Sequence, residues 1–166
     1  LGGAKFGLAE ARLLVNRRHP QIVDVVGTST NGRISIIVME YLSGGSLKDR
    51  MANVRPWQES LVTAREICDG LTFLHRNRVV HGNLRPSNIL MSADGQAKLS
   101  DVGLDEHYAG DPAAQNWYGI PGEARSVAAD VFAAGMIFSE MFTGAVPAWK
   151  KGHLIQRHTQ SSEAFY

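Results

Sequence analysis

The stretch from His81 to Gly103 constrains the fold of this chain more than any other part of its 166 residues. Residues 88–91 and 97–99 are mainly apolar, which predicts two short strands, and residues 93–95 (Ala-Asp-Gly) between them predict a turn. Polar loops lie before the first strand and after the second. We therefore expect a small paired unit that carries polar, chemically competent residues at its ends.

Three residues on those loops, Asn83, Asn88 and Asp101, have oxygen atoms that could serve a metal ion. Each of them alone is most simply explained as a turn former, because Asn and Asp side chains stabilise turns. Taken together, a carboxylate and an amide oxygen form a reasonable site for a hard cation. Mg²⁺ prefers oxygen ligands and fills the rest of its shell with water and phosphate oxygens.

Hydrophobic periodicity outside this stretch predicts both helices and strands. Helices are expected at residues 8–18, 58–76 and 127–143, and strands at residues 21–28 and 33–40. Residues 127–143 are apolar on nearly every side, which is typical of a helix inside a protein, and Gly144 is expected to end it. Ser46 is expected to cap a short helix, and the polar tail from Lys150 onward to be poorly ordered. The predicted fold class is α+β.

Composition and charge exclude several functional classes. The formal net charge is +1 and the Lys and Arg residues are scattered, so we expect no nucleic-acid partner. No segment approaches the ~18 apolar residues of a membrane span. The one cysteine, Cys68, is expected to be a small buried hydrophobic residue, and so few cysteines fit a reducing, cytoplasmic setting.

The central stretch resembles the catalytic loop of protein kinases, H-R-D-L-x-x-x-N, followed by their D-F-G metal loop. Here the catalytic loop is residues 81–88 and the metal loop is residues 101–103. The residues that match as they stand are His81, Leu84, Pro86, Asn88, Asp101 and Gly103. On these motifs the chain is identified as a member of the protein kinase superfamily.

Further segments match that family in the same order along the chain. Glu10 precedes His19-Pro20 as the αC glutamate of the family precedes its own His-Pro. Residues 36–42, followed by Ser-Gly-Gly-Ser-Leu, resemble the last strand of the N-lobe and the hinge. Asp130 resembles the aspartate that opens the buried αF helix. The resemblance spans about residues 8–145.

The resemblance implies a kinase-like fold, mostly the helical C-lobe with αC and part of the N-lobe sheet. We expect one partial domain over residues 1–166, with residual N-lobe in about 1–40 and hinge and truncated C-lobe in 41–166. The strand lysine of the family should lie about twenty residues before Glu10, yet only nine residues precede Glu10. Without that lysine, Glu10 is expected to be either exposed to solvent or paired with a different charged residue. Residues 1–7 are either a linker or a remnant of the glycine-rich loop, and we favour the linker.

The resemblance also assigns site residues. It makes Asn88 and Asp101 the metal ligands and His81 a buried structural residue. The adenine of ATP would lie against Met39, Glu40, Tyr41 and Leu42, with Leu90 as the floor. Weak binding of ATP with Mg²⁺ is therefore expected.

Departures from the family pattern concern the chemistry. Asn83 stands where the family has the aspartate that takes or orients the substrate proton, and a neutral amide cannot take that proton. Arg85 stands where a catalytic-loop lysine is usual, and Val102 replaces the phenylalanine of the metal loop. Gly82 replaces the arginine that pairs with a loop phosphate in many members, and residues 103–123 contain no Ser or Thr. Phosphorylation of that segment on Ser or Thr is therefore not expected to switch the protein.

Three functions stay open at this point. The favoured one is a catalytically impaired kinase-like domain, a pseudokinase, that binds or regulates a protein partner or an adjacent domain. The second is an active but slow Ser/Thr-type kinase whose N-lobe is missing from this sequence. The third is a degenerate fragment with no role of its own.

Overall fold

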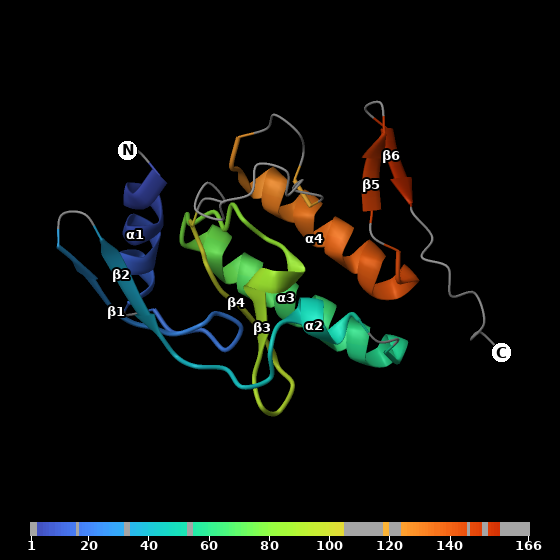
Figure 1. Ribbon diagram of the computed structural model, residues 1–166, viewed down its shortest axis with the longest axis horizontal. Helices are drawn as coiled ribbons and strands as arrows, with labels where there is room; N and C mark the ends of the chain where they lie inside the picture. Colours follow the sequence, from blue (N-terminus) through green and yellow to red (C-terminus); the bar gives the residue numbers. More distant parts are fainter. Residues whose placement is uncertain are drawn as a thin grey trace.

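The fold is taken from a computed structural model (Figure 1). It describes residues 3–15, 17–31, 34–52, 55–104, 118–119, 124–145, 147–150 and 153–156. Helices and short two-stranded sheets alternate along these residues, which confirms the predicted α+β class.

The N-terminal part consists of helix α1 (Gly3–Leu14) beside an antiparallel hairpin. The hairpin strands are β1 (Val25–Thr30) and β2 (Ser35–Met39), with Thr28 opposite Ile37. Helix α1 begins earlier than predicted, so the linker expected at residues 1–7 is wrong from Gly3 onward, where the backbone is helical.

A connecting segment leads from the hairpin to helix α2 (Leu47–Arg50). Its backbone pairs with the next strand, because the Gly44 amide donates to Met91 O (2.9 Å) and the Met91 amide donates to Gly45 O (2.9 Å). Ser46 caps α2 as predicted, in a reciprocal box with Asp49.

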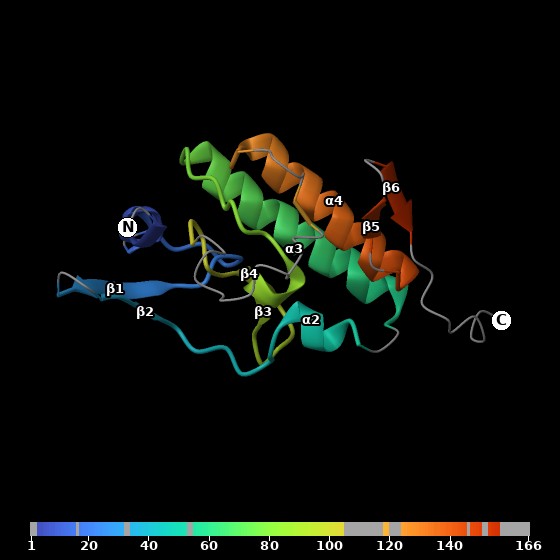
Figure 2. The same ribbon diagram turned by 45° about the horizontal axis from the view of Figure 1, so that its top comes forward.

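Helices α3 (Trp57–Arg76) and α4 (Val127–Thr143) lie side by side and form the main body of the helical part (Figure 2). Ile67 and Leu74 of α3 and Ile137 of α4 are fully buried between elements. Cys68, expected to be buried, is exposed instead. The apolar pattern located the helix correctly, but Cys68 lies just outside the face that packs inward.

Helix α4 is also less enclosed than its sequence predicts. Val127, Val131 and Phe142 are 47%, 59% and 45% exposed, so the helix buries one face rather than its whole circumference. Gly144 ends it with a φ of 68°, a left-handed conformation that suits glycine, as predicted. The chain then forms a hairpin of β5 (Pro147–Lys150) and β6 (His153–Gln156), so the tail expected to be poorly ordered contains a strand.

The two strands predicted from the central stretch are confirmed. A short 3₁₀ turn (Pro86–Asn88) leads into β3 (Ile89–Met91), which pairs with β4 (Ala97–Leu99). Strand β4 also bonds to residues 21–23, through Leu99 N to Gln21 O and Val23 N to Leu99 O. This pairing joins the N-terminal part to the helical part. Within the described residues, no helix is long and apolar enough to cross a membrane.

Candidate functional site

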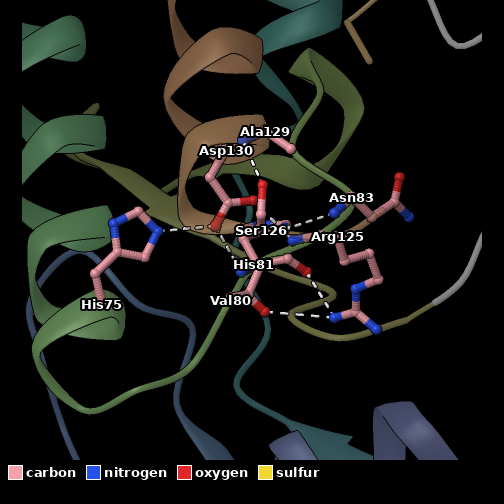
Figure 3. Close-up of polar contacts among 9 residues, drawn as sticks. His75, Val80, His81, Asn83, Arg125, Ser126, Ala129 and Asp130 are labelled. Atoms are coloured by element: carbon pink, nitrogen blue, oxygen red, sulfur yellow. Dashed lines mark hydrogen bonds and ion pairs between the residues drawn. The ribbon is translucent and has the colours of Figure 1, made fainter. Parts of the chain in front are cut away.

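The catalytic loop is held at its first residues by a buried carboxylate from α4. Asp130 is 2% exposed and accepts hydrogen bonds from the backbone amides of His81 and Gly82, each at 2.8 Å. His75 of α3 lies 2.8 Å from the same carboxylate (Figure 3). The Asp130 side chain thus joins α3, α4 and the catalytic loop. At the start of α4, the Ser126 hydroxyl caps the helix by accepting a hydrogen bond from the Ala129 amide.

His81 is a structural residue, as predicted. Its side chain is completely buried, and burial lowers its pKa from 6.5 to about 4, although the charge of Asp130 acts in the opposite direction. The Asn83 amide donates to its Nδ1 at 3.4 Å. The ring is therefore neutral near pH 7 and helps to shape the turn that presents Asn83.

Asn83 lies at the tip of this turn, and its side chain points away from the Asp130 cluster (Figure 3). Its carbonyl accepts a hydrogen bond from Asn88 Nδ2 at 2.8 Å. Its side-chain Oδ1 is buried and has no hydrogen-bond partner among the described residues. The loop therefore presents a neutral amide at the position assigned to the general base.

Asn88 and Asp101, the predicted metal ligands, belong to segments that the structure brings together. The backbone amide and the hydroxyl of Ser100 donate to Asn88 O at 2.9 and 3.1 Å, so the residue preceding Asp101 is bonded directly to Asn88. Asn88 is 8% exposed, and its Oδ1 accepts from Ser87 Oγ at 3.2 Å. That oxygen has a second lone pair for a cation.

Asp101 is a largely buried carboxylate that has no ion-pair partner among the described residues. Burial raises its pKa, and a hydrogen bond with Ser100 only partly offsets this effect. Its φ of 55° is unusual for a residue other than glycine. No cluster of three or more His, Cys, Asp or Glu side chains suited to a metal exists in the described part of the chain. One carboxylate and one amide oxygen fit Mg²⁺ brought in with phosphate, rather than a metal held by protein ligands alone.

A small, solvent-connected cleft with an enclosed volume of about 20 Å³ lies between α1, the β1–β2 hairpin and the metal loop. Its lining includes Met39, Asp101 and Val102, and Val102 is buried at 6% exposure. Of the residues predicted to contact adenine, Met39 alone is part of this lining. The other four, Glu40, Tyr41, Leu42 and Leu90, lie outside it.

The segment predicted to bind adenine is anchored through the side chain of Glu40. Glu40 Oε1 accepts from Lys98 Nζ at 2.6 Å and from the Asp24 amide at 2.8 Å. Burial alone would raise the pKa of the Glu40 carboxyl, but these hydrogen bonds outweigh that effect and the pKa is lowered. Within the described residues, neither Glu40 O nor Leu42 N has a backbone partner, which leaves one acceptor and one donor for a flat heterocycle. The Tyr41 side chain is 89% exposed and contributes no wall.

The last two predicted residues lie on either side of the 3₁₀ turn. Arg85 precedes the turn in an extended conformation. Burial and the carboxylate of Glu140 raise the pKa of Tyr118, and the charge of Arg85 only partly opposes this rise. Leu90 is half-buried in β3, opposite Lys98. Lys98 was missed by the sequence analysis, because its bond to Glu40 spans 58 positions.

Arg125 was missed as well. Its guanidinium donates to His81 O at 3.3 Å and to Val80 O at 3.4 Å (Figure 3). It also donates to Gly103 O at 3.1 Å. The guanidinium also lies 3.9 Å from the carboxylate of Glu10 in α1. Glu10 is therefore paired with a different charged residue, which is one of the two alternatives predicted for it. No sequence motif identified Arg125, because it lies in the irregular segment before α4.

Comparisons with known proteins agree with this geometry. Residues 5–165 match the family described as the protein kinase domain. Serine/threonine-protein kinase STE11 of Saccharomyces cerevisiae is 31% identical over 153 residues, which cover 83% of this chain and 21% of the yeast protein. Receptor protein kinase WSS1 of Oryza sativa is 32% identical over 163 residues, which cover 86% of this chain and 18% of the rice protein.

A third relative has higher identity over a shorter region. U-box domain-containing protein 33 of Arabidopsis thaliana is 43% identical over 102 residues, covering 57% of this chain and 12% of that protein. The chain thus spans about a fifth or less of the length of these three relatives.

Proposed function

The chain belongs to the protein kinase domain family, and from that premise we propose that it is a catalytically impaired member that regulates or binds a protein partner or an adjacent domain. The proposal includes weak binding of ATP with Mg²⁺. It treats the chain as one partial kinase-like domain, with residual N-lobe in about residues 1–40 and hinge and C-lobe in 41–166.

The single observation that carries the proposal is the amide of Asn83. Kinases of this family use an aspartate at this position to accept or orient the substrate proton. Asn83 is held by Asn88 on its carbonyl and by His81 on its amide, so the loop keeps its shape while lacking a base. Loss of a general base lowers the rate by about 10²–10⁴-fold.

Retained chemistry supports the nucleotide part of the proposal. The family's cofactors are ATP and Mg²⁺, and Asn88 and Asp101 supply the oxygen ligands expected for the metal. When bound, Mg²⁺ would neutralise phosphate charge, and it would also supply a counter-charge to the buried carboxyl of Asp101. Glu40 O and Leu42 N would hold the adenine edge.

The proposed loss of catalytic activity is tested by restoring an aspartate at position 83. We expect Asn83→Asp to raise phosphate incorporation from labelled ATP into a generic protein substrate by about 10²-fold or more over the unmodified protein. Asn31→Asp, an equivalent change at the exposed tip of the β1–β2 hairpin, is the matched control and should have no effect. Turnover by the unmodified protein equal to that of Asn83→Asp would contradict the proposed impairment.

The proposed binding of ATP with Mg²⁺ is tested separately by thermal-shift titration. We expect ATP to raise the unfolding temperature only when Mg²⁺ is present, and Asp101→Asn to abolish that rise. Asp69→Asn changes an exposed carboxylate on α3 whose ion pair with Arg65 is long, at 3.8 Å, and should preserve the rise. An unchanged ATP response in Asp101→Asn would refute the assigned metal site.

A slow but active Ser/Thr-type kinase is the second candidate. It is favoured by the intact pair Asn88 and Asp101 and by STE11, whose name describes a serine/threonine-protein kinase. Phosphoryl transfer depends largely on positioning and metal ions, so an amide at residue 83 does not by itself exclude slow transfer. Magnesium-dependent phosphate incorporation by the unmodified protein that is lost in Asp101→Asn would establish this alternative.

A further inference from the structure

We propose that Arg125 is a built-in latch that holds helix α1 against the metal loop and the catalytic loop without phosphorylation. The inference concerns regulation of the site described above, and it holds whether or not the site transfers phosphate. Arg125 is a positioning residue in this proposal, because it acts on the backbone of both loops and not on a substrate.

The first observation is the space above Gly82. Its φ is 72°, and a Cβ atom built there would lie 1.9 Å from Arg125 Nε and 2.6 Å from Arg125 Cζ. The guanidinium therefore occupies the volume that any side chain at residue 82 would need. The absence of a side chain at residue 82 and the presence of arginine at 125 are two parts of one arrangement.

The second observation is the set of carbonyls that surround the guanidinium. Val80 O lies just before the catalytic loop, His81 O is in its first residue, and Gly103 O belongs to the metal loop. A guanidinium has five donors in a rigid fork, so it can bridge two loops at once, which a lysine ammonium cannot do in the same geometry. The two loops are thereby fixed relative to each other.

The third observation is the contact with α1. Glu10 reaches the guanidinium from the helix, and the side chains of Glu10 and Arg125 are 21% and 26% exposed. A Cβ built on Gly103, whose φ is 80°, would lie 2.7 Å from Glu10 Cβ and Cγ, so the helix side chain rests directly on the metal-loop backbone. The latch thus has α1 on one side and both loops on the other.

Glu10 Oε2 and Arg125 Nε are buried and have no partner among the described residues. The ion pair is therefore weaker than a fully satisfied buried pair. The bonds to the carbonyls and the packing on Gly103 carry most of the positioning.

All partners of the latch are present in the unmodified chain. The contacts use three backbone carbonyls and one carboxylate, and residues 103–123 contain no Ser or Thr. In many kinases an arginine at the position of Gly82 pairs with a phosphate on the activation loop, whereas Arg125 reaches this region from another segment and binds backbone carbonyls that the chain supplies without phosphorylation. We infer that α1 is held close to Asp101 constitutively.

Hydrogen exchange of the purified protein tests the latch. We expect Arg125→Ala and Gly82→Ala each to speed the exchange of amides in residues 8–14 and 101–104 by about tenfold or more, because each removes charge-assisted bonds that close both segments. Exchange in the core of α3, residues 64–74, should not change. Arg65→Ala removes an exposed arginine on α3 and is the matched control.

Two further variants keep the test decisive if Arg125→Ala folds poorly. Glu10→Gln leaves the carbonyl bonds intact and should speed the exchange of residues 8–14 only, and Arg125→Lys should resemble Arg125→Ala. Phosphatase treatment of the protein without substitutions should leave the hydrogen exchange of residues 8–14 unchanged. Unchanged exchange of residues 8–14 in Arg125→Ala, an equal rise throughout α3, or a rise after phosphatase treatment would each overturn the proposal.

Discussion

At the residue scale, a few buried polar atoms determine what the catalytic loop can do. Asp130 and Asn88 satisfy backbone groups of that loop, so its shape does not depend on an acidic residue at position 83. His81 fills the space beneath the loop as a neutral ring. Structural support and proton-transfer chemistry are thus separate properties here, and the proposed impairment concerns only the second.

The burial of His81 predicts a specific loss of stability in acid. The pKa of His81 is about 4 in the folded protein and near 6.5 when the ring is exposed. At pH values between 4 and 6.5 the unfolded chain therefore binds a proton on His81 that the folded chain does not bind. The free energy of unfolding should carry no His81 penalty above pH 6.5 and should fall by up to about 3 kcal/mol as the pH drops to 4.

Chemical denaturation at a series of pH values measures this effect. His81→Phe keeps a buried ring without the titrating group, so its unfolding free energy should depend less on pH over that range. His19→Gln changes a histidine outside this cluster and should retain the pH dependence that His81 causes. Identical pH profiles for His81→Phe and the unmodified protein would contradict the assignment.

At the element scale, local signals explain most of what was predicted correctly. The turn before β4, the Ser46 cap of α2 and the Gly144 end of α4 each depend on residues within a few positions of one another. Helix α3 was found from its periodicity, since its buried residues recur at helical spacing. The contact between the connecting segment and β3 was not predicted, because strand pairing at a distance leaves no local pattern.

That contact gives a prediction for Gly44. A Cβ at Gly44 would lie 2.5 Å from the backbone oxygens of Met91 and Ser92, neither of which can rotate away. Gly44→Ala should therefore push the segment off β3 and lower the free energy of unfolding by about 1–3 kcal/mol. Gly27→Ala is the matched control, because a Cβ there has no atom within 4 Å. Equal stability of the two variants in urea denaturation would count against this pairing.

At the scale of the whole molecule, long-range connections between described residues join the N-terminal part to the helical part. They include the pairing of residues 21–23 with β4, the bond from Lys98 to Glu40 and the contact of Arg125 with Glu10. Asp130 has the same role within the helical part, where it joins α3, α4 and the catalytic loop. The candidate site lies where these connections converge, so its geometry is a property of the assembled fold.

Asp130→Asn tests this view at the whole-molecule scale. An amide has one accepting oxygen and a donating nitrogen, so it cannot serve His81 N, Gly82 N and His75 Nε2 together. We expect the free energy of unfolding to fall by about 2 kcal/mol or more, because buried donors lose their acceptor. Asp69→Asn on exposed α3 surface should change it little. Differential scanning calorimetry of both variants would decide, and similar unfolding temperatures would refute the central role of Asp130.

The sequence by itself determined the family, the α+β class and the order of the elements from α1 to α4, and it nominated Asn83, Asn88 and Asp101 as candidate site residues. It could do so because caps, turns, periodicity and short motifs act over a few neighbouring residues. Only the tertiary structure decided that Cys68 faces outward, that Lys98 anchors Glu40, and that Arg125 fills the space above Gly82. Arg125 lies 44 positions from the His81 carbonyl that it bonds, and which side chain fills a vacated space depends on packing between distant segments.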